Sequence, residues 1–415
     1  MTIQWNEPKF GEFEEKLVSD VLKSGYVSEG PITTELEDRL AKIVGCKYVI
    51  MTTSCTAALY LAVQAVERVT PYSRRNYPYV YPSLTFVATK NAIELSNKSS
   101  WCCDVDKDRF LFNFQEIVDG SQDDRMCSPI IVNILGRGIG ENVLKYYKSK
   151  DIFVVCDNAG CLGSNVPIGD IGCYSLQGNK IISCGQGGFC ATNDETLAKE
   201  IRRIKDFGRR TKEDNSSIGF NFKFNDILAA VALGQLKYLE ERKELLKFQY
   251  NHYKFELKDL GRFIEFKEGE IPLWIEFITP LRDKLFDYLK KEGITCRKPW
   301  EEIGNRVNAK FYCKNCIWLP NGPSLSTENL NIVIKKIKEF FKDKPKLTIL
   351  PIQEEDNIRT HNHLIGGRSM SINDLIVSTP LGSPMSRIES ELSSSTSQIE
   401  MQNAVRNVYD EVSTI

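Results

Sequence analysis

The sequence predicts an α/β protein in which helices cover a buried parallel or mixed sheet. Between about Cys46 and Thr192, short apolar runs alternate with longer amphipathic or polar stretches. Runs without polar alternation suit strands that are buried on both faces. A chain of 415 residues with 42% hydrophobic and 26% charged residues can also bury a large core. The apolar runs are YVIM, YVY, SSWCC, PIIVNIL, IFVVC, CYSL and GFCAT.

Beyond this region, a helical pattern should link a large domain to a smaller one. From Asn225 to about Phe248, apolar residues recur at helical spacing, and Asn225 suits the N-cap of one long helix. The following segment contains a strand-like run, PLWIEFI, a helix near 281–292 and a final helix after Ser326. We therefore predict a large domain at 1–244 and a small domain at 245–343.

Residues 344–415 differ in composition from the rest of the chain. Ser, Thr and Pro are enriched, as in STPLGSP and SSSTS, and such a composition disfavours a compact core. We expect a flexible tail, with at most a short helix near 399–412. Because His361 and His363 lie in this tail, His252 is the only histidine elsewhere in the chain. This distribution argues against a Ser-His or Cys-His hydrolase.

Charge and cysteine content exclude several further classes of protein. The formal net charge of -1 gives no electrostatic reason to bind nucleic acid or an anionic membrane. No window approaches the about 18 to 20 apolar residues of a transmembrane helix, and the N-terminus is too acidic and polar for a secretory signal. Thirteen scattered cysteines, an odd number, then indicate free thiols in the cytoplasm. Cys313 and Cys316 form a single CxxC without a second pair, so no metal site is expected.

Three polar groups follow predicted strands, and together they indicate a cofactor site. Lys180 lies in a short turn after CYSL and just before a glycine cluster, and Asp157 ends the run IFVVC. The run YVIM is followed by a Ser- and Thr-rich turn, residues 52–56, before a helical pattern. Lysines in such turns are usually solvated. However, an amine, a carboxylate and a phosphate-sized cradle at strand ends are the three contacts that pyridoxal 5'-phosphate (PLP) requires.

The chain also resembles the DegT/StrS-type nucleotide-sugar aminotransferases, which are PLP-dependent enzymes. The similarity extends from about Gly25 to about Phe341, and its motifs occur in the order found in the family. It implies PLP-dependent aminotransferase fold type I, with a large, mostly parallel seven-stranded sheet domain and a smaller α+β C-terminal domain. The motifs are GYVSEGP, TSCTAALYLAV, YPSLTFVATKNAI, DVD, CDNAGCLGS, SLQGNK, GQGG, GFNFKFND and LPNGPSLSTENL.

The resemblance implies roles for individual residues. Lys180 would form an imine with PLP and then carry a proton between substrate and cofactor. Asp157 would face the pyridine nitrogen and keep the ring protonated, and Phe86 would stack on the ring. Asn221 would reach the cofactor phosphate of a neighbouring subunit, which implies a homodimer with a shared active site. The other cofactor-binding residues would be Ser54, Cys55, Thr56, Ser175 and Gln177.

Phosphate binding would rest mainly on the helix that begins near Ser54. Unpaired N–H groups and a favourable dipole at a helix N-terminus bind anions. The chain departs from the family at several positions. Cys55 replaces a common glycine, Gly160 a common glutamine, histidine or glutamate, and Asn133 a common histidine. The segment between Trp300 and Trp318 is short and has no PLH-type motif, which changes the expected mouth of the substrate site.

These features predict an aminotransferase with ping-pong kinetics. An amino acid, glutamate by analogy with the family, would convert the cofactor to pyridoxamine 5'-phosphate, which would then aminate a keto sugar carried on a nucleotide. The GNK triplet around Lys180 resembles enzymes that act at C4 of 4-keto-6-deoxyhexoses and form perosamine or viosamine. Two alternatives remain: a 3-keto sugar aminotransferase and a PLP-binding regulatory homologue without turnover. A sugar 3-dehydratase of this family would have histidine in place of Lys180.

Overall fold

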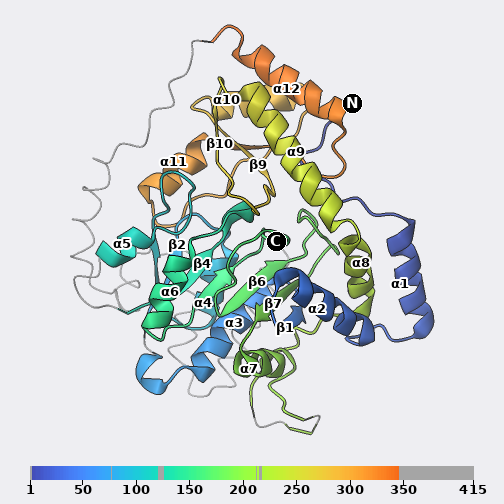
Figure 1. Cartoon of the computed structure of the whole chain (residues 1–415), viewed down its shortest axis with the longest axis vertical. Coiled ribbons are helices and arrows are strands. Elements are labelled where there is room, and N and C mark those ends of the chain that lie inside the picture. The colour runs from blue at the N-terminus through green and yellow to red at the C-terminus, as the bar shows by residue number, and fades with distance from the viewer. Residues whose placement is uncertain (1, 76, 120–125, 212, 215–216, 345–415) are drawn as a thin grey trace, which may run out of the picture. The chain divides into compact units, whose positions relative to one another are not determined.

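A seven-stranded sheet forms the centre of the computed structural model, with strand order β1-β7-β6-β5-β4-β2-β3 (Figure 1). Only β7 runs antiparallel to its neighbours, β1 and β6. The other neighbouring pairs are parallel. The predicted α/β class and mostly parallel sheet are therefore confirmed. The strands are β1 Tyr48–Thr52, β2 Tyr79–Pro82, β3 Ser100–Cys103, β4 Ser128–Val132, β5 Val155–Asp157, β6 Ile171–Ser175 and β7 Gly188–Thr192.

Every apolar run predicted as a strand contains one, but some strands are shorter than the run. In IFVVC only Val155 and Cys156 pair within the sheet, and the strand extends one residue further to Asp157. In PIIVNIL the strand ends at Val132, and Ile134–Gly136 form a turn of 3-10 helix. Hydrophobicity marks burial rather than pairing, so the ends of apolar runs do not mark the ends of strands.

Helices cover both faces of the sheet. Helix α3 packs across β5, β6 and β7 on one face and contacts α4 and α7. Side chains from α2 and α6 belong to the apolar core on the other face. These helices are α1 Glu12–Ser24, α2 Pro31–Val44, α3 Cys55–Val69, α4 Ala88–Leu95, α5 Phe114–Asp119, α6 Glu141–Ser149 and α7 Glu195–Lys205.

A smaller antiparallel sheet, with the order β10-β9-β8, follows in the sequence. Its core includes apolar side chains from α9, α10 and α12. The expected final helix begins after Ser326, whose side chain accepts a hydrogen bond from the Asn329 N–H. The elements are α8 Asp226–Leu236, α9 Leu239–Leu257, β8 Arg262–Phe263, β9 Ile275–Ile278, α10 Arg282–Lys291, α11 Val307–Asn315, β10 Cys316–Leu319 and α12 Thr327–Phe341.

The single long helix predicted from Asn225 to Phe248 is wrong, because two helices occupy this segment. Asn225 does cap the first, accepting a hydrogen bond from the Leu228 N–H. The chain tightens after Leu236, where the Tyr238 N–H bonds to the Gln235 carbonyl, three residues back. Helix α8 packs closely on α1, where a Cβ at Gly234 would lie only 2.7 Å from Glu14 Cγ. Helix α9 then extends to the small sheet (Figure 1).

The structure describes residues 2–75, 77–119, 126–211, 213–214 and 217–344, and these residues belong to one compact unit. The boundary proposed at residue 244 stays a prediction. Except for Lys344, the predicted tail at 344–415, with its two histidines and its short helix, lies outside the described residues. In the described part, no helix combines the length and apolar character needed to cross a membrane.

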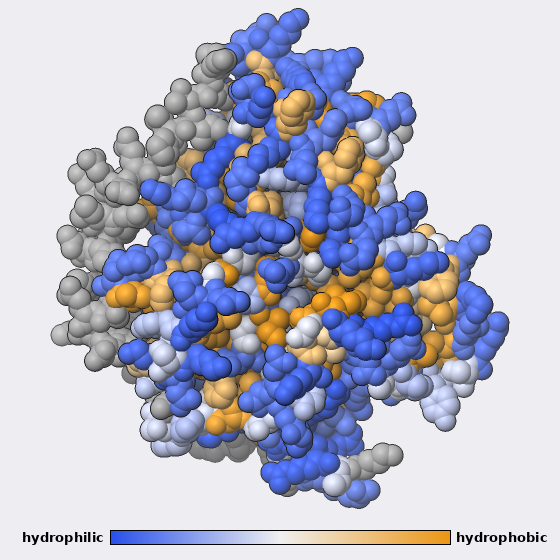
Figure 2. All heavy atoms as spheres, in the orientation of Figure 1, coloured by the Kyte–Doolittle hydropathy of each residue, from blue (hydrophilic) through white to orange (hydrophobic). Residues whose placement is uncertain are grey.

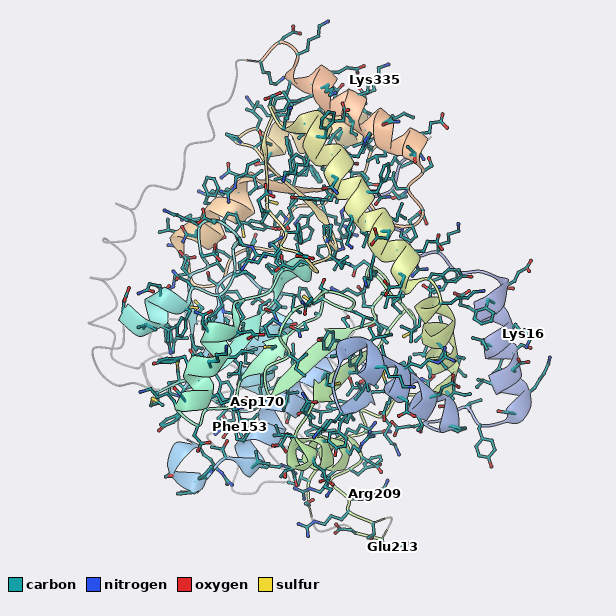
Figure 3. The ribbon with its side chains drawn as sticks, viewed as in Figure 1. Lys16, Phe153, Asp170, Arg209, Glu213 and Lys335 are labelled. Atoms are coloured by element: carbon teal, nitrogen blue, oxygen red, sulfur yellow. The ribbon has the colours of Figure 1, made fainter. Side chains whose placement is uncertain are left out.

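Charged side chains extend into solvent from the outer helices, as Lys16 on α1 and Lys335 on α12 illustrate (Figure 3). Lys16 pairs with Asp20 one turn away at 2.7 Å. On the face shown in Figure 2, one of the areas where orange atoms gather lies near α8 and α2. There a groove of about 660 Å³ lies between α1, α2 and α8. Two of its charged residues, Arg39 and Glu35, pair with each other at 2.7 Å.

A buried ion pair joins the two sheets. Arg137, which follows β4, is fully buried and forms a bidentate pair with Glu276 on β9. Tyr312 on α11 donates a further hydrogen bond to the same carboxylate. Asp104, after β3, accepts hydrogen bonds from the N–H groups of Asn308 and Ala309 in the first turn of α11. Both contacts fix the small sheet and α11 against the large sheet.

Replacing Glu276 with glutamine should strongly destabilise the fold. The substitution leaves the Arg137 guanidinium buried without its counter-charge, which typically costs about 3 to 5 kcal/mol. Urea unfolding followed by circular dichroism would measure the change. Asp20→Asn is the matched control, since it removes a carboxylate from an exposed pair. A Glu276→Gln midpoint equal to that of the control would contradict the structural role of the buried pair.

Candidate active site

A cavity of about 510 Å³ opens at the carboxyl edge of the large sheet. Its lining comes from the segments that follow β1, β2, β4, β5 and β6, and from Gly187 just before the antiparallel β7. Ligands of open α/β sheets bind at this edge, because the connecting loops converge there. The cavity contains eight of the nine predicted site residues: Ser54, Cys55, Thr56, Phe86, Asp157, Ser175, Gln177 and Lys180.

Lys180 lies in the turn after β6, and its backbone N–H donates to the Gln177 carbonyl at 2.9 Å. The side chain extends beside Trp274, with Nζ 5.1 Å from the centre of that ring system. Burial lowers the pKa of Lys180 from 10.5, and the negative charge of Asp157 acts in the opposite direction. Desolvation therefore favours a neutral amine, the form that can attack a carbonyl carbon.

Asp157 ends β5 and is only 5% exposed. One carboxylate oxygen accepts a hydrogen bond from Thr89 Oγ1 at 2.7 Å, and the other accepts the Ala159 N–H at 3.1 Å. Burial raises the pKa of Asp157, while these hydrogen bonds and the charge of Lys180 oppose the rise. A cationic ring placed against this carboxylate would favour its ionised form further.

The start of α3 forms another wall of the cavity. Ser54 is the N-cap, and its Oγ accepts the Ala57 N–H at 3.1 Å, so its hydroxyl hydrogen is still free to donate. The neighbouring β7 approaches this turn very closely at Gly188. A Cβ at Gly188 would lie 2.3 Å from the Cys55 nitrogen, so only glycine allows the observed packing. Cys55 itself is buried, which raises the pKa of its thiol and keeps it protonated.

Phe86 follows β2 and exposes 51% of its surface, an unusual exposure for a large apolar side chain. It lines the cavity and contacts Trp300, with ring centres 5.9 Å apart. Across the cavity lining, Ser175 accepts the Gln177 N–H at 3.3 Å through its hydroxyl oxygen. The polar and aromatic residues predicted for one cofactor thus do meet at one cavity.

Asn221 is the predicted site residue that lies outside this cavity. It is exposed, and its backbone pairs with Asp206 in an isolated β-bridge. The sequence-based role placed its side chain in the site of a neighbouring subunit. That role, and the homodimer it implies, stay predictions.

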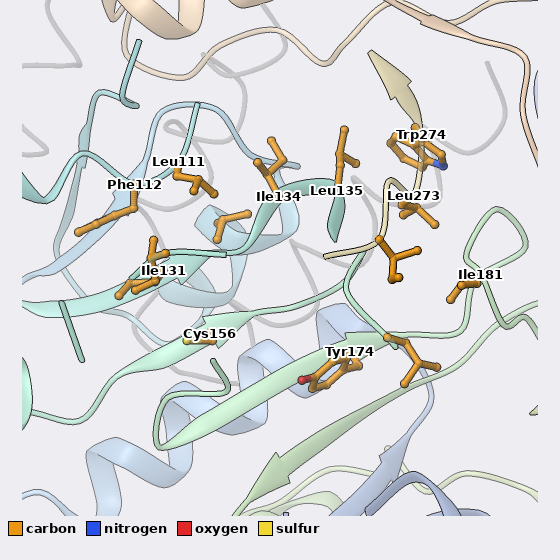
Figure 4. Close-up of a cluster of buried hydrophobic side chains, with 14 of the residues drawn as sticks. Leu111, Phe112, Ile131, Ile134, Leu135, Cys156, Tyr174, Ile181, Leu273 and Trp274 are labelled. Atoms are coloured by element: carbon orange, nitrogen blue, oxygen red, sulfur yellow. The ribbon is translucent and has the colours of Figure 1, made fainter. Parts of the chain in front are cut away.

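Two departures from the family pattern have packing reasons in this chain. Asn133 is buried and donates to Asn158 Oδ1 at 2.7 Å and to the Pro167 carbonyl at 2.9 Å. Gly160 faces Leu273, and a Cβ there would lie 3.0 Å from a Leu273 methyl carbon. Leu273 and Leu135 occupy this part of the core next to Trp274 (Figure 4). A longer side chain at residue 160 would have to displace them.

Sequence reasoning missed several residues that shape the site. Thr89 orients Asp157, as described above. Arg242 on α9 donates to the Ile181 carbonyl at 2.8 Å and so holds the lysine turn. Trp274, Trp300 and Arg297 line the cavity from the small-sheet side. Each comes from a segment remote in sequence, and only the two tryptophans give a signal, as large aromatic residues in PLW and RKPW.

Metal ligands do not gather in the described part of the chain. There, no group of three or more His, Cys, Asp or Glu side chains could hold a metal ion. Cys313 and Cys316 are both buried and free. His252 is remote from the cavity lining, and its ring accepts or donates a hydrogen bond with Asn331 at 2.8 Å.

Comparison with known proteins agrees with this geometry. GDP-perosamine synthase of Escherichia coli O157:H7 is 25% identical over 367 residues, covering 81% of this chain and 98% of that protein. An aminotransferase structure from Brucella abortus matches with a TM-score of 0.73 and 25% identity, over 79% of this chain and 95% of that one. The PLP form of Spr1654 from Streptococcus pneumoniae shares the fold, with a TM-score of 0.75 at 22% identity, over 84% and 100% of the two chains.

A family model matches residues 8–338, which is most of the chain. The matched region includes both sheets and every residue of the cavity described above. The resemblance stated from the sequence motifs is confirmed. The chain belongs to the DegT/DnrJ/EryC1/StrS aminotransferase family.

Proposed function

We propose that this protein transfers an amino group from an amino acid, with glutamate as the expected donor, to a keto sugar carried on a nucleotide. The observation that carries the proposal is the meeting of a desolvated amine, Lys180, and a buried carboxylate, Asp157, in one cavity of the family's fold. We expect amination at C4 of a 4-keto-6-deoxyhexose. The GNK triplet and the similarity to GDP-perosamine synthase support this position.

The cavity residues fit PLP as the cofactor. The start of α3, with Ser54 and Thr56, offers N–H groups and hydroxyls for a phosphate, and the tight contact at Gly188 holds this turn against β7. Asp157 suits the pyridine nitrogen, and Phe86 has an exposed ring face for stacking. When bound, the cofactor supplies an aldehyde and an electron-accepting ring.

In this proposal Lys180 has two tasks. Its neutral amine would bind the cofactor aldehyde, and burial, which lowers the pKa of Lys180, favours that neutral form. With the amino donor bound, Lys180 Nζ would take the proton from the donor α-carbon. Trp274 lies against the amine, and Arg242 fixes the following carbonyl, so that the side chain is held over the cavity.

Asp157 would hold the pyridine proton, and Thr89 would hold Asp157. The Thr89 hydroxyl donates to one carboxylate oxygen of Asp157, and the Ala159 N–H donates to the other. These two donors fix the orientation of the carboxylate plane. This arrangement positions the negative charge before any ligand arrives, which is how preorganised sites stabilise charge.

The regulatory alternative rests on the replacements at Asn133 and Gly160 and on the long C-terminal tail, which lies outside the described residues. Both residues have packing roles in this structure, so their presence gives no reason to expect lost turnover. The deciding experiment incubates the purified protein with PLP and glutamate and records the absorbance spectrum. Nucleotide-linked 4-keto and 3-keto sugars are then added separately, and amine formation is followed by mass spectrometry. If neither class of sugar is aminated, the proposal is overturned.

Lys180→Ala should abolish the glutamate-dependent absorbance change. We expect a loss of at least about 100-fold in rate, because the proton carrier is removed. Stopped-flow absorbance measures the rate, and circular dichroism checks that the variant is folded. The control is Lys199→Ala, an exposed lysine on α7 that pairs with Glu195. Near-normal turnover by Lys180→Ala would refute the assigned role.

Asp157→Asn should retain the cofactor but slow proton transfer by about 100-fold or more, because an amide cannot hold the pyridine proton as a carboxylate does. With glutamate deuterated at the α-carbon, the variant should show a larger isotope effect than the wild type. Full activity with an unchanged isotope effect would mean that Asp157 has no electronic role.

Gly188→Ala should weaken PLP binding by about tenfold or more, since the added methyl must push the start of α3 out of place. A spectroscopic titration measures the affinity. Gly178→Ala is the matched control, because a Cβ at Gly178 meets nothing within 4 Å. Equal affinities for the two variants would show that the close packing at residue 188 does not shape the phosphate site.

A further inference from the structure

Four of the five tryptophans of the chain form one cluster beside the cavity. Trp274 contacts Trp5, Trp318 and Trp300, with ring centres 5.0, 4.5 and 6.1 Å apart. Trp300 also contacts Trp318 at 5.1 Å and extends the cluster to Phe86 at 5.9 Å. Trp5, Trp274 and Trp318 are buried, whereas Trp300 is partly exposed on the cavity side. The cluster therefore builds a rigid aromatic wall.

Arg297 lies on this wall at the cavity lining. Two backbone hydrogen bonds with Trp318, of 3.0 and 2.8 Å, fix its main chain against β10. Its guanidinium carbon lies 5.2 Å from the ring centre of Trp5. Stacking of this kind uses the flat face of the guanidinium and leaves its N–H donors directed outward. Among the described residues, no carboxylate forms an ion pair with Arg297, and its side chain is exposed.

The charged residues that line the cavity differ in how exposed they are to solvent. Asp157 is buried, Lys180 is partly buried and Arg297 is exposed, and these three are the charged residues of the described lining. Lys180 and Asp157 are committed to the reacting end in the proposed function. Arg297 is then the one remaining cation of that lining, and it lies toward solvent. An arginine with open donors on a rigid support is suited to a bidentate oxyanion.

We propose that Arg297 and Trp300 form the subsite that binds the diphosphate and the adjoining ring of a nucleoside diphosphate. This inference rests on the proposed function and assigns its specificity to two residues of this chain. The diphosphate accepts the guanidinium N–H groups, and the exposed face of Trp300 stacks on the sugar or base beside it.

The amino donor is the less suitable ligand for this subsite. In an amino acid the α-carboxylate is one bond from the reacting carbon. A cationic side chain that binds this carboxylate should therefore lie as far inside the cavity as Lys180. Arg297 is exposed, which instead fits a group several bonds from the reacting carbon. A small amino acid also offers no ring for Trp300. Geometry and surface chemistry therefore both favour the nucleotide end of the acceptor.

The test is calorimetric titration of the full-length protein, purified with PLP, with GDP, UDP and dTDP in turn. For the nucleotide that the wild type binds, Arg297→Ala should weaken the affinity by about tenfold to a hundredfold, as expected for a lost charged hydrogen-bond pair. The affinity of Arg297→Lys should lie between those of the wild type and Arg297→Ala, since lysine keeps the positive charge but loses the paired N–H donors of the guanidinium. The affinity of Arg297→Ala should also depend less on salt concentration.

Lys298→Ala is the matched control, because Lys298 is the next cation along the chain, pairs with Asp283 and is absent from the cavity lining. It should bind within about twofold of the wild type. The glutamate concentration that half-saturates the first half-reaction should be the same for Arg297→Ala and the wild type. If Arg297→Ala raises the half-saturating glutamate concentration and the nucleotide dissociation constant by the same factor, the assignment to the diphosphate is overturned. An unchanged nucleotide affinity in Arg297→Ala, or a wild type that binds none of the three nucleotides, would also overturn it.

The subsite and the proposed reaction can fail separately. Binding of a nucleotide that depends on Arg297, without amine transfer to any nucleotide-linked keto sugar, supports the subsite and refutes the reaction. Amine transfer to such a sugar at the same rate and half-saturation in Arg297→Ala supports the reaction and refutes the subsite.

Discussion

The desolvation of Lys180 is the constraint on which the site depends. Burial lowers the pKa of this amine and raises the pKa of Asp157, so each group is pushed toward its neutral form. Their mutual attraction and the hydrogen bonds from Thr89 and Ala159 oppose that tendency. The result is that two groups with perturbed pKa values line the same cavity. Such perturbed groups in a cavity are typical of catalytic sites.

The architecture provides this environment by bringing remote segments to one edge of the sheet. Parallel strands place the carboxyl ends of β5 and β6, with Asp157 and the Lys180 turn, next to each other. The opposite wall comes from the small sheet, where Trp274 lies two residues before Glu276. The buried pair of Glu276 with Arg137 thus anchors the same segment that packs on the lysine. Stability of the interface between the sheets and geometry of the site are therefore linked.

Local patterns predicted much of this arrangement. Apolar runs located all strands of the large sheet, and motifs located eight of the residues that line the cavity, from Ser54 to Lys180. What local patterns could not predict depends on contacts between distant segments. The helix break after Leu236 falls inside one continuous helical pattern of apolar residues, and the tryptophan wall joins Trp5 to residues about 300 positions later. The proposed role of Asn221 requires a second subunit and remains a prediction.

The most direct measurement is borohydride reduction of the full-length protein mixed with PLP, followed by peptide mapping at several pH values. The peptide that contains Lys180 should carry the label near neutral pH, where exposed lysines are protonated and react poorly. Its labelling should fall as the pH falls through the lowered pKa of the amine. Label spread over surface lysines, with the Lys180 peptide unmodified, would contradict the assignment of the cavity as a cofactor site.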